Sequence, residues 1–259
     1  MSTWVLLRGL TRESRHWGEF PALLQAQVGA AQVVTLDLPG NGRLNAQTSP
    51  TRVDEMAASC RAALRESGLP PPYHLLAMSL GAMVALAWAR QHPEELQGCV
   101  LINTSLRTFS PWYQRLRPRN YRAVLGMALS RDPAANERSV LEITTRHPTV
   151  APATLLAQWT RWRIENPVSR ANALRQLWAA ARFSTPRAAP QVPLLALVSA
   201  ADGLVDPRCS QRLAQAWGAE LRCHPTAGHD LPLDDGAWVA HQVRAWLAAL
   251  GQAPRKCFL

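Results

Sequence analysis

The sequence predicts an α/β protein whose mostly parallel sheet is flanked by helices and interrupted by a helical insertion. Short apolar runs of strand length alternate with helical stretches, which is typical of a parallel sheet. Residues 106–190 contain no clear buried strand, only helix-like segments separated by prolines and polar turns. With 259 residues, 47% of them hydrophobic, the chain can bury a substantial core.

Six apolar runs are the expected strands: Trp4–Leu7, Gln32–Leu36, Tyr73–Met78, Cys99–Asn103, Val192–Ala200 and Glu220–Cys223. A final amphipathic helix is expected at about Asp235–Leu250. We therefore expect residues 1–105 and 191–259 to form the sheet-bearing core. Residues 106–190 should form an inserted, arginine-rich helical unit.

Ser79 lies at the junction between the apolar run Tyr73–Met78 and the Ala- and Leu-rich stretch Leu80–Arg90. A serine on a sharp strand-to-helix turn exposes its hydroxyl beside backbone N–H groups, which favour developing negative charge. Such a turn needs small neighbours, and Ala77 and Gly81 supply them in an A-x-S-x-G pattern. The alternative is a serine that caps an ordinary helix.

Two aspartates follow the expected strand Val192–Ala200. Asp206 directly precedes Pro207, and helix capping explains an aspartate in that position. Asp202 has no such explanation and lies just past the carboxyl end of the strand, where α/β sheets place functional groups. We predict that Asp202 is the functional residue, the alternative being a turn aspartate.

His229 lies in a loop between the expected strand Glu220–Cys223 and the last helix. The other histidines precede prolines or lie in expected strands and helices; they are His16, His74, His92, His147, His224 and His241. The order Ser79, Asp202, His229 therefore predicts a catalytic triad for nucleophilic acyl chemistry.

These residues resemble the α/β-hydrolase superfamily, in which Ser, Asp and His follow one another in this order. The resemblance covers nearly the whole chain. It includes Leu6–Leu10 with Trp17 nearby, which looks like the oxyanion loop, and Leu36–Gly40, which looks like the loop after the next strand. It implies that residues 106–190 are a helical cap that roofs the acyl pocket. The layout is similar to that of the pimeloyl-acyl-carrier-protein methyl ester esterase type.

The resemblance also implies that the backbone N–H groups of Leu10 and Leu80 form an oxyanion hole, with Trp17 and Arg8 on the substrate side. Arg8 departs from the family pattern, because relatives usually carry histidine before the glycine. Its side chain either reads an acidic group of the substrate or pairs with a nearby carboxylate.

The expected function is hydrolysis of a carboxylic ester or acyl thioester through a Ser79 acyl-enzyme, as in a carboxylesterase or thioesterase. The alternatives that use the same triad are a lyase, a cofactor-free perhydrolase and a short-peptide or amide hydrolase. A further alternative is a ligand-binding homologue that keeps the triad without turnover.

The net charge of +10 is concentrated in residues 106–190, which hold fourteen arginines, no lysine and four acidic residues. This field would attract an anionic partner, although codon bias could also explain arginine in place of lysine. An acyl chain on an acidic acyl carrier protein or on CoA is the first candidate. A membrane surface is the second, because this stretch has four tryptophans. Nucleic acid is not expected, because no recognised binding motif is present.

We expect no cofactor and no metal. Gly40–Asn45 begins like a dinucleotide fingerprint but lacks the third glycine, and the histidines and cysteines lack zinc-ligand spacing. The five scattered cysteines favour a reducing compartment. No signal sequence or segment of membrane-spanning length is recognised, so a cytoplasmic protein is expected.

Overall fold

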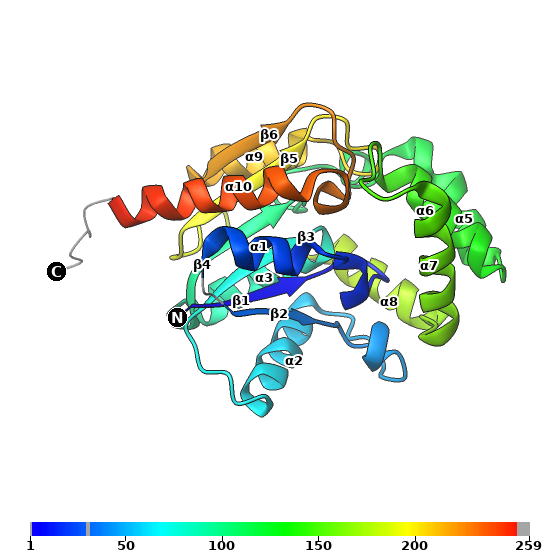
Figure 1. The fold of residues 1–259 in the computed structure, drawn as a ribbon, viewed down its shortest axis with the longest axis horizontal. Helices are drawn as coiled ribbons and strands as arrows, with labels where there is room; N and C mark the ends of the chain where they lie inside the picture. Colours follow the sequence, from blue (N-terminus) through cyan, green and yellow to red (C-terminus); the bar gives the residue numbers. More distant parts are fainter. Residues whose placement is uncertain (1, 30–31, 253–259) are drawn as a thin grey trace.

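The computed structural model describes residues 2–29 and 32–252 and confirms the expected α/β class (Figure 1). Its sheet consists of β1 (Thr3–Leu7), β2 (Gln32–Leu36), β3 (Tyr73–Met78), β4 (Leu96–Ile102), β5 (Leu194–Ser199) and β6 (Glu220–His224). The strand order is β2-β1-β3-β4-β5-β6, and every neighbouring pair is parallel. The chain reverses its direction of travel across the sheet between β1 and β3, a switch point at which α/β sheets form binding sites.

The strand bounds lie close to those expected, and β4 shows the largest difference. It begins at Leu96, three residues before the expected Cys99. The added residues include Gln97, which is exposed, and Gly98, and neither type favours a strand. The pairing of β3 with β4 also shifts register in this region, between Tyr73 and His74. The sequence pattern therefore does not predict that β4 begins before Cys99.

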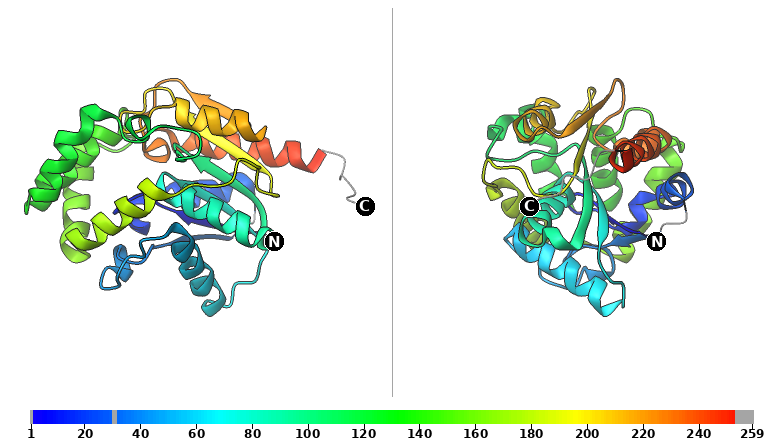
Figure 2. Two further views of the ribbon diagram at one scale, coloured as in Figure 1. Left: turned by 180° about the vertical axis from the view of Figure 1, so that it is seen from behind. Right: turned by 90° about the vertical axis from the view of Figure 1, so that its left-hand side faces the viewer.

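Helices cover both faces of the sheet (Figures 1 and 2). One face carries α1 (Phe20–Val28) and α10 (Leu231–Gln252, kinked at Asp235); the other carries α2 (Val53–Glu66), α3 (Leu80–Gln91) and α9 (Arg208–Trp217). Alternate residues of β1 belong to two separate cores, because successive side chains of a strand point to opposite faces. Short 3₁₀ helices occur at Ser14–Trp17 (η1), Gly42–Leu44 (η2), Pro93–Glu95 (η3) and Pro118–Asn120 (η4).

The segment between β4 and β5, residues 106–190, is hereafter called the insert. Its described residues form no strand, as expected, and its helices are α4 (Trp112–Arg115), α5 (Tyr121–Leu129), α6 (Pro133–Thr144), α7 (Pro152–Glu165) and α8 (Arg170–Arg182). They lie beyond the carboxyl ends of the strands (Figure 1). α6 and α7 share a small core of Leu141, Leu155 and Trp159. Within the described ranges, no helix is long and apolar enough to span a membrane.

Gly81 lets the start of α3 pack directly against the end of β1. A Cβ atom at this position would lie 2.4 Å from the Leu7 carbonyl oxygen and 2.6 Å from that of Arg8. Both are backbone atoms, so they could move away only if β1 itself shifted. The glycine of the A-x-S-x-G pattern is therefore required by close backbone approach as well as by the turn.

We expect Gly81→Ala to lower the free energy of unfolding by about 3 kcal/mol through overpacking. Gly126→Ala in α5 is the matched control, because no atom lies within 4 Å of its added methyl group. It should be neutral or stabilise the protein by up to about 1 kcal/mol. Urea unfolding of both variants measures the difference, and equal stabilities would contradict the close approach at Gly81.

Candidate active site

Ser79 has a strained backbone at the junction of β3 and α3. Its φ of 53° and ψ of −118° are rare for a residue with a side chain. Its N–H donates to the Ile102 carbonyl at 3.0 Å, and its carbonyl accepts from the Thr104 hydroxyl at 3.0 Å. It occupies the N-cap position of α3, but its side chain makes no capping hydrogen bond. The capping alternative therefore does not explain this serine.

The loop after β1 packs against the Ser79 turn. A Cβ atom on Gly9 would lie 3.2 Å from the Ser79 Cβ atom, so the loop that carries Leu10 is in contact with the serine. Leu80 is the first residue of α3, and the N–H group of a first helical residue has no partner within its helix. The two residues expected to form an oxyanion hole thus follow Gly9 and Ser79, which touch each other.

Asp202 and His229 form a buried hydrogen-bonded pair. The distance from His229 Nδ1 to Asp202 Oδ2 is 2.7 Å, and the two residues are 3% and 2% exposed. The other oxygen of Asp202 accepts from the backbone N–H groups of Leu204 and Val205, at 2.8 and 2.9 Å. Every oxygen of the carboxylate is therefore engaged, and the imidazole is held in one orientation.

Asp206, the competing aspartate, has a different partner. Its carboxylate accepts from the backbone and side chain of Arg208, and this guanidinium lowers the pKa of Asp206. α9 begins at Arg208, one residue later than the expected start at Pro207. Pro207, not Asp206, occupies the N-cap position of α9, but the Asp206 carboxylate still accepts from the N–H of Arg208, the first residue of the helix. The partner of His229 is Asp202.

Asn103 connects the serine turn with the histidine loop, and sequence reasoning missed it. It has a φ of 45° and directly follows Ile102, the residue that accepts the Ser79 N–H. Its side chain accepts from the Ser199 N–H at 2.8 Å and donates to the His229 carbonyl at 2.8 Å. The available signal was a polar residue at the carboxyl end of β4, at the same sheet edge as the candidate catalytic residues.

Hydrogen bonds from backbone and side chain hold the insert against the histidine loop. The Asp230 N–H donates to the Thr144 carbonyl at the end of α6, at 2.8 Å. Asp234 accepts from Gly228 N at 2.6 Å and from Arg146 N at 2.9 Å, so one carboxylate bridges the loop and the insert. The position of His229 therefore depends on where the insert sits.

Arg8 pairs with a carboxylate, the second of the two alternatives given for it. Its Nη1 and Nη2 atoms donate to Asp230 at 3.0 and 2.5 Å, and both residues are 2% exposed. The guanidinium also lies over the Trp17 ring, 4.8 Å from its centroid. Trp17 is 4% exposed and stacks on Phe20 within the core. Arg8 thus joins the expected oxyanion loop to the residue that follows His229.

A second buried ion network joins the same loop to the insert. Arg12 donates to Glu137 of α6 at 2.5 Å and stacks on Trp159 of α7 at 4.0 Å. Glu137 also accepts from Arg163 of α7 at 2.8 Å. Burial by itself would raise the pKa of Glu137, but the two arginines outweigh it and hold this pKa below its ordinary value. Glu137 is therefore ionised at neutral pH and binds the loop to both helices.

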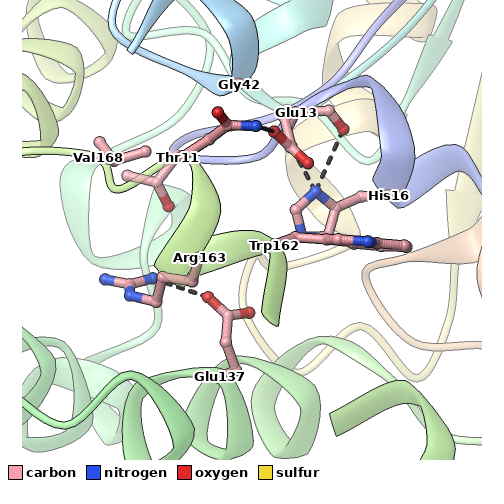
Figure 3. A pocket seen from close by; sticks show the side chains of 9 residues that line it. Thr11, Glu13, His16, Gly42, Glu137, Trp162, Arg163 and Val168 are labelled. Atoms are coloured by element: carbon pink, nitrogen blue, oxygen red, sulfur yellow. Dashed lines mark hydrogen bonds and ion pairs between the residues drawn. The ribbon is translucent and has the colours of Figure 1, made fainter. Parts of the chain in front are cut away.

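Figure 3 shows a narrow pocket beside this network, at the joint between the core and the insert. Burial, together with the neighbouring Arg12 and Arg8, lowers the pKa of His16 well below its usual value, so its imidazole is neutral at pH 7. Its Nδ1 faces the backbone of Glu13. The pocket is lined by Thr11, Glu13, His16, Gly42, Glu137, Trp162, Arg163, Asn166 and Val168. These contacts make it a structural joint rather than a second acid–base site.

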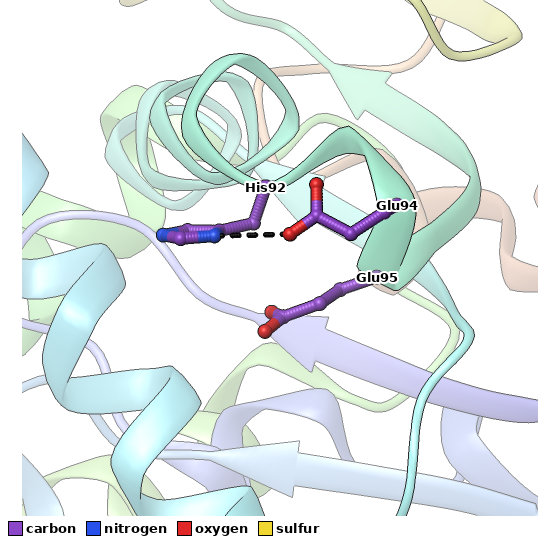
Figure 4. Close-up of side chains that lie close together, drawn as sticks. All are labelled: His92, Glu94 and Glu95. Atoms are coloured by element: carbon purple, nitrogen blue, oxygen red, sulfur yellow. Dashed lines mark hydrogen bonds and ion pairs between the residues drawn. The ribbon is translucent and has the colours of Figure 1, made fainter.

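One cluster, His92, Glu94 and Glu95, has the residue types of a metal site (Figure 4). Both oxygens of Glu95 already accept from Arg61, at 2.5 and 2.7 Å, and one also accepts from Trp88 Nε1. The Arg61 guanidinium lowers the pKa of Glu95 to about 2 and would repel a cation. The cluster is therefore an ion-paired anchor between α2, α3 and η3.

Comparison with known proteins identifies the family. A profile of the alpha/beta hydrolase fold matches residues 5–236. The chain is 31% identical over 238 residues to the putative carbamate hydrolase RutD of Klebsiella pneumoniae, covering 89% of this chain and 85% of that protein. It is 32% identical over 105 residues to the biotin biosynthesis bifunctional protein BioHC of Teredinibacter turnerae, covering 40% of this chain but only 17% of that protein. A thermophilic esterase from Thermogutta terrifontis has a similar fold, with a TM-score of 0.75, 20% identity, and coverage of 96% of this chain and 90% of that one.

We expect Arg8→Met to lower the free energy of unfolding by about 3–5 kcal/mol, because it leaves the buried Asp230 carboxylate unpaired. The double variant Arg8→Met/Asp230→Asn removes that charge and should lose less than the single variant. Arg52→Met is the surface control, since Arg52 is 69% exposed and its pairs should contribute less than about 1 kcal/mol. Chemical denaturation measures the free energy of unfolding of each variant. A single variant Arg8→Met as stable as the double variant would contradict the expectation.

Proposed function

The chain belongs to the α/β-hydrolase family, and on that premise we propose that it is a serine hydrolase that cleaves a carboxylic ester or acyl thioester. One observation carries the proposal. The strained Ser79, with its hydroxyl not used for capping, follows β3 at the same sheet edge as the buried Asp202–His229 pair. Nucleophile, base and orienting acid are the three groups that acyl transfer through a serine needs.

In the proposed mechanism, the Ser79 hydroxyl attacks the acyl carbonyl carbon while His229 Nε2 takes the hydroxyl proton. Asp202 at Nδ1 favours the tautomer whose Nε2 lone pair is free, and it stabilises the imidazolium that forms. The imidazolium then protonates the leaving alcohol or thiol, which leaves an acyl-enzyme. Water, activated by His229, releases the acid and restores the serine.

The backbone N–H groups of Leu10 and Leu80 are proposed to stabilise the tetrahedral oxyanion. Gly9 in contact with Ser79, and Leu80 at the first position of α3, support this assignment. A hydrogen bond from the insert holds the loop after Leu10, because the Thr11 N–H donates to Gln176 Oε1 of α8 at 2.9 Å. Preorganised donors of this kind need no rearrangement when charge develops.

The insert is proposed to act as the cap that shapes the acyl pocket, with residues 1–105 and 191–259 as the catalytic core. Its fourteen arginines against four acidic residues favour a substrate with an anionic carrier, such as CoA or an acidic acyl carrier protein. The four described cysteines are free thiols, in keeping with the expected cytoplasmic compartment.

Carbamate hydrolysis is the second candidate function, favoured by the match to RutD over 89% of this chain. The same serine attack would apply to a carbamate carbonyl. A lyase or a cofactor-free perhydrolase on this triad would be labelled at Ser79 yet hydrolyse simple esters poorly. A ligand-binding homologue without turnover would show no covalent labelling.

We expect Ser79→Ala to lower kcat/KM on p-nitrophenyl esters by about 10⁴-fold or more, because triad members act as a unit. Ser59→Ala on α2, whose hydroxyl bonds the Glu55 carbonyl, is the control and should keep wild-type activity. Initial rates across acyl lengths measure both the loss and the pocket size, with a fluorophosphonate label counting active sites. Absence of labelling in the wild type would overturn the assignment of Ser79.

Asp202→Asn should lower kcat by about 10⁴-fold while the protein stays folded, because an amide cannot hold His229 in the required tautomer. Asp132→Asn is the control, since Asp132 caps α6 through Ala134 N and asparagine caps as well. Steady-state kinetics and melting temperatures together check this expectation. Wild-type kcat in Asp202→Asn would show that another group orients the histidine.

A further inference from the structure

A groove of about 300 Å³ lies where the first part of the insert meets the start of α9. It is separate from the joint in Figure 3 and has no residue in common with it. Its lining residues are Tyr113, Gln114, Arg117, Pro118, Arg119, Asp206 and Arg208. Its volume lies at the lower end of the range typical of small-ligand sites.

The groove carries an excess of positive charge. Three guanidinium groups, those of Arg117, Arg119 and Arg208, line it together with one carboxylate, that of Asp206. Residues 106–131 contain six arginines and no acidic residue, so the surroundings on the insert side do not neutralise this excess. A concave surface lined by one sign of charge raises the local concentration of oppositely charged ligands.

The three arginines are held differently. Arg208 is bound to Asp206, and Arg119 donates from Nε and Nη2 to the Gly203 carbonyl, which fixes its orientation. Arg117 has no side-chain hydrogen bond to any described residue, and its Nε is buried without a partner. No protein acceptor among the described residues holds the Arg117 guanidinium, so this group is available to an oxygen-rich anion in the groove.

The loop that follows Asp202 is hydrogen-bonded to the segment of the insert that lines the groove. The Arg117 N–H donates to the Leu204 carbonyl at 3.0 Å, and the Asp206 N–H donates to the Gln114 carbonyl at 2.9 Å. Leu204 in turn donates its N–H to Asp202. A ligand held in the groove therefore lies against the segment that holds the proposed catalytic aspartate.

We propose that this groove binds the phosphate groups of the acyl substrate's leaving group, and that this leaving group is a nucleoside-diphosphate-bearing thiol of the coenzyme A kind. Arginine forks match phosphate oxygens in geometry and charge. The substrate class rests on the proposed hydrolase function. Phosphate binding in the groove does not, so it can be measured separately.

The binding test uses inorganic pyrophosphate as the probe and titration calorimetry on the full chain carrying Ser79→Ala, which removes turnover. Arg117→Gln in that background should weaken pyrophosphate binding about tenfold or more, because a charged hydrogen-bonding group is lost. Arg117→Lys keeps the charge without the fork and should fall between the two. Arg138→Gln is the charge-matched control, since Arg138 is exposed on α6 and outside the groove.

The kinetic test compares kcat/KM for butanoyl-CoA with that for butanoyl-N-acetylcysteamine, which has the same thioester but no phosphate. The wild-type preference for the CoA thioester should fall tenfold or more in Arg117→Gln and persist in Arg138→Gln.

Equal pyrophosphate binding by all variants, or no pyrophosphate binding by any of them, would overturn the proposal. A preference for a carrier-protein thioester without pyrophosphate binding would also overturn it, in favour of a protein-docking surface. Pyrophosphate binding without hydrolysis of either thioester would keep phosphate binding in the groove and reject a coenzyme A thioester as the substrate, whereas the hydrolase function itself is tested on p-nitrophenyl esters.

Discussion

The parallel direction of all six strands is the constraint on which the candidate site depends, because it brings every strand's following loop to one edge of the sheet. Ser79 follows β3, Asp202 follows β5 and His229 follows β6. These loops are far apart in the chain, so only the sheet can bring them together. The close backbone approach at Gly81 and the bonds of Asn103 then fix the serine turn and the histidine loop relative to that edge.

Buried charges hold the insert against the core in one position. Replacing buried ion pairs by apolar groups often costs no stability, but leaving one partner unpaired is expensive, so such pairs specify geometry more than they add stability. Arg12 forms an ion pair with Glu137 of the insert, and Arg8 forms one with Asp230. The Asp230 N–H in turn donates to the carbonyl of Thr144 in the insert. The loop next to the serine and the loop that holds His229 are therefore both tied to the unit beyond the strand ends. A shift of the insert would disturb both loops at once.

The arginines of the insert fall into two groups that composition alone does not separate. Some have a structural role: Arg163 donates a hydrogen bond to Glu137, and Arg115 donates to backbone carbonyls of α8. By contrast, the side chain of Arg117 has no hydrogen-bond partner within the described ranges and lines a groove. The positive charge of this region thus arises partly from packing needs and partly from groups free to meet an anion. Only the arginines of the second group are available to bind an anionic ligand.

The α/β class, the strand-to-helix turn at Ser79 and the preference for Asp202 over Asp206 could all be predicted from the amino-acid sequence. Each of these follows from residues close together in the chain, such as apolar runs, small neighbours or a proline at a helix start. Folding of distant segments against one another, and no local pattern, set the partner of Arg8, the hydrogen bonds of Asn103 and the ion pair between Arg12 and Glu137. Arg8 and Asp230 are 222 residues apart, and no local pattern records such a pairing. The preference of a segment for helix, strand or turn depends on its neighbouring residues. The partner of a buried charge depends instead on which distant elements pack against it in the folded protein.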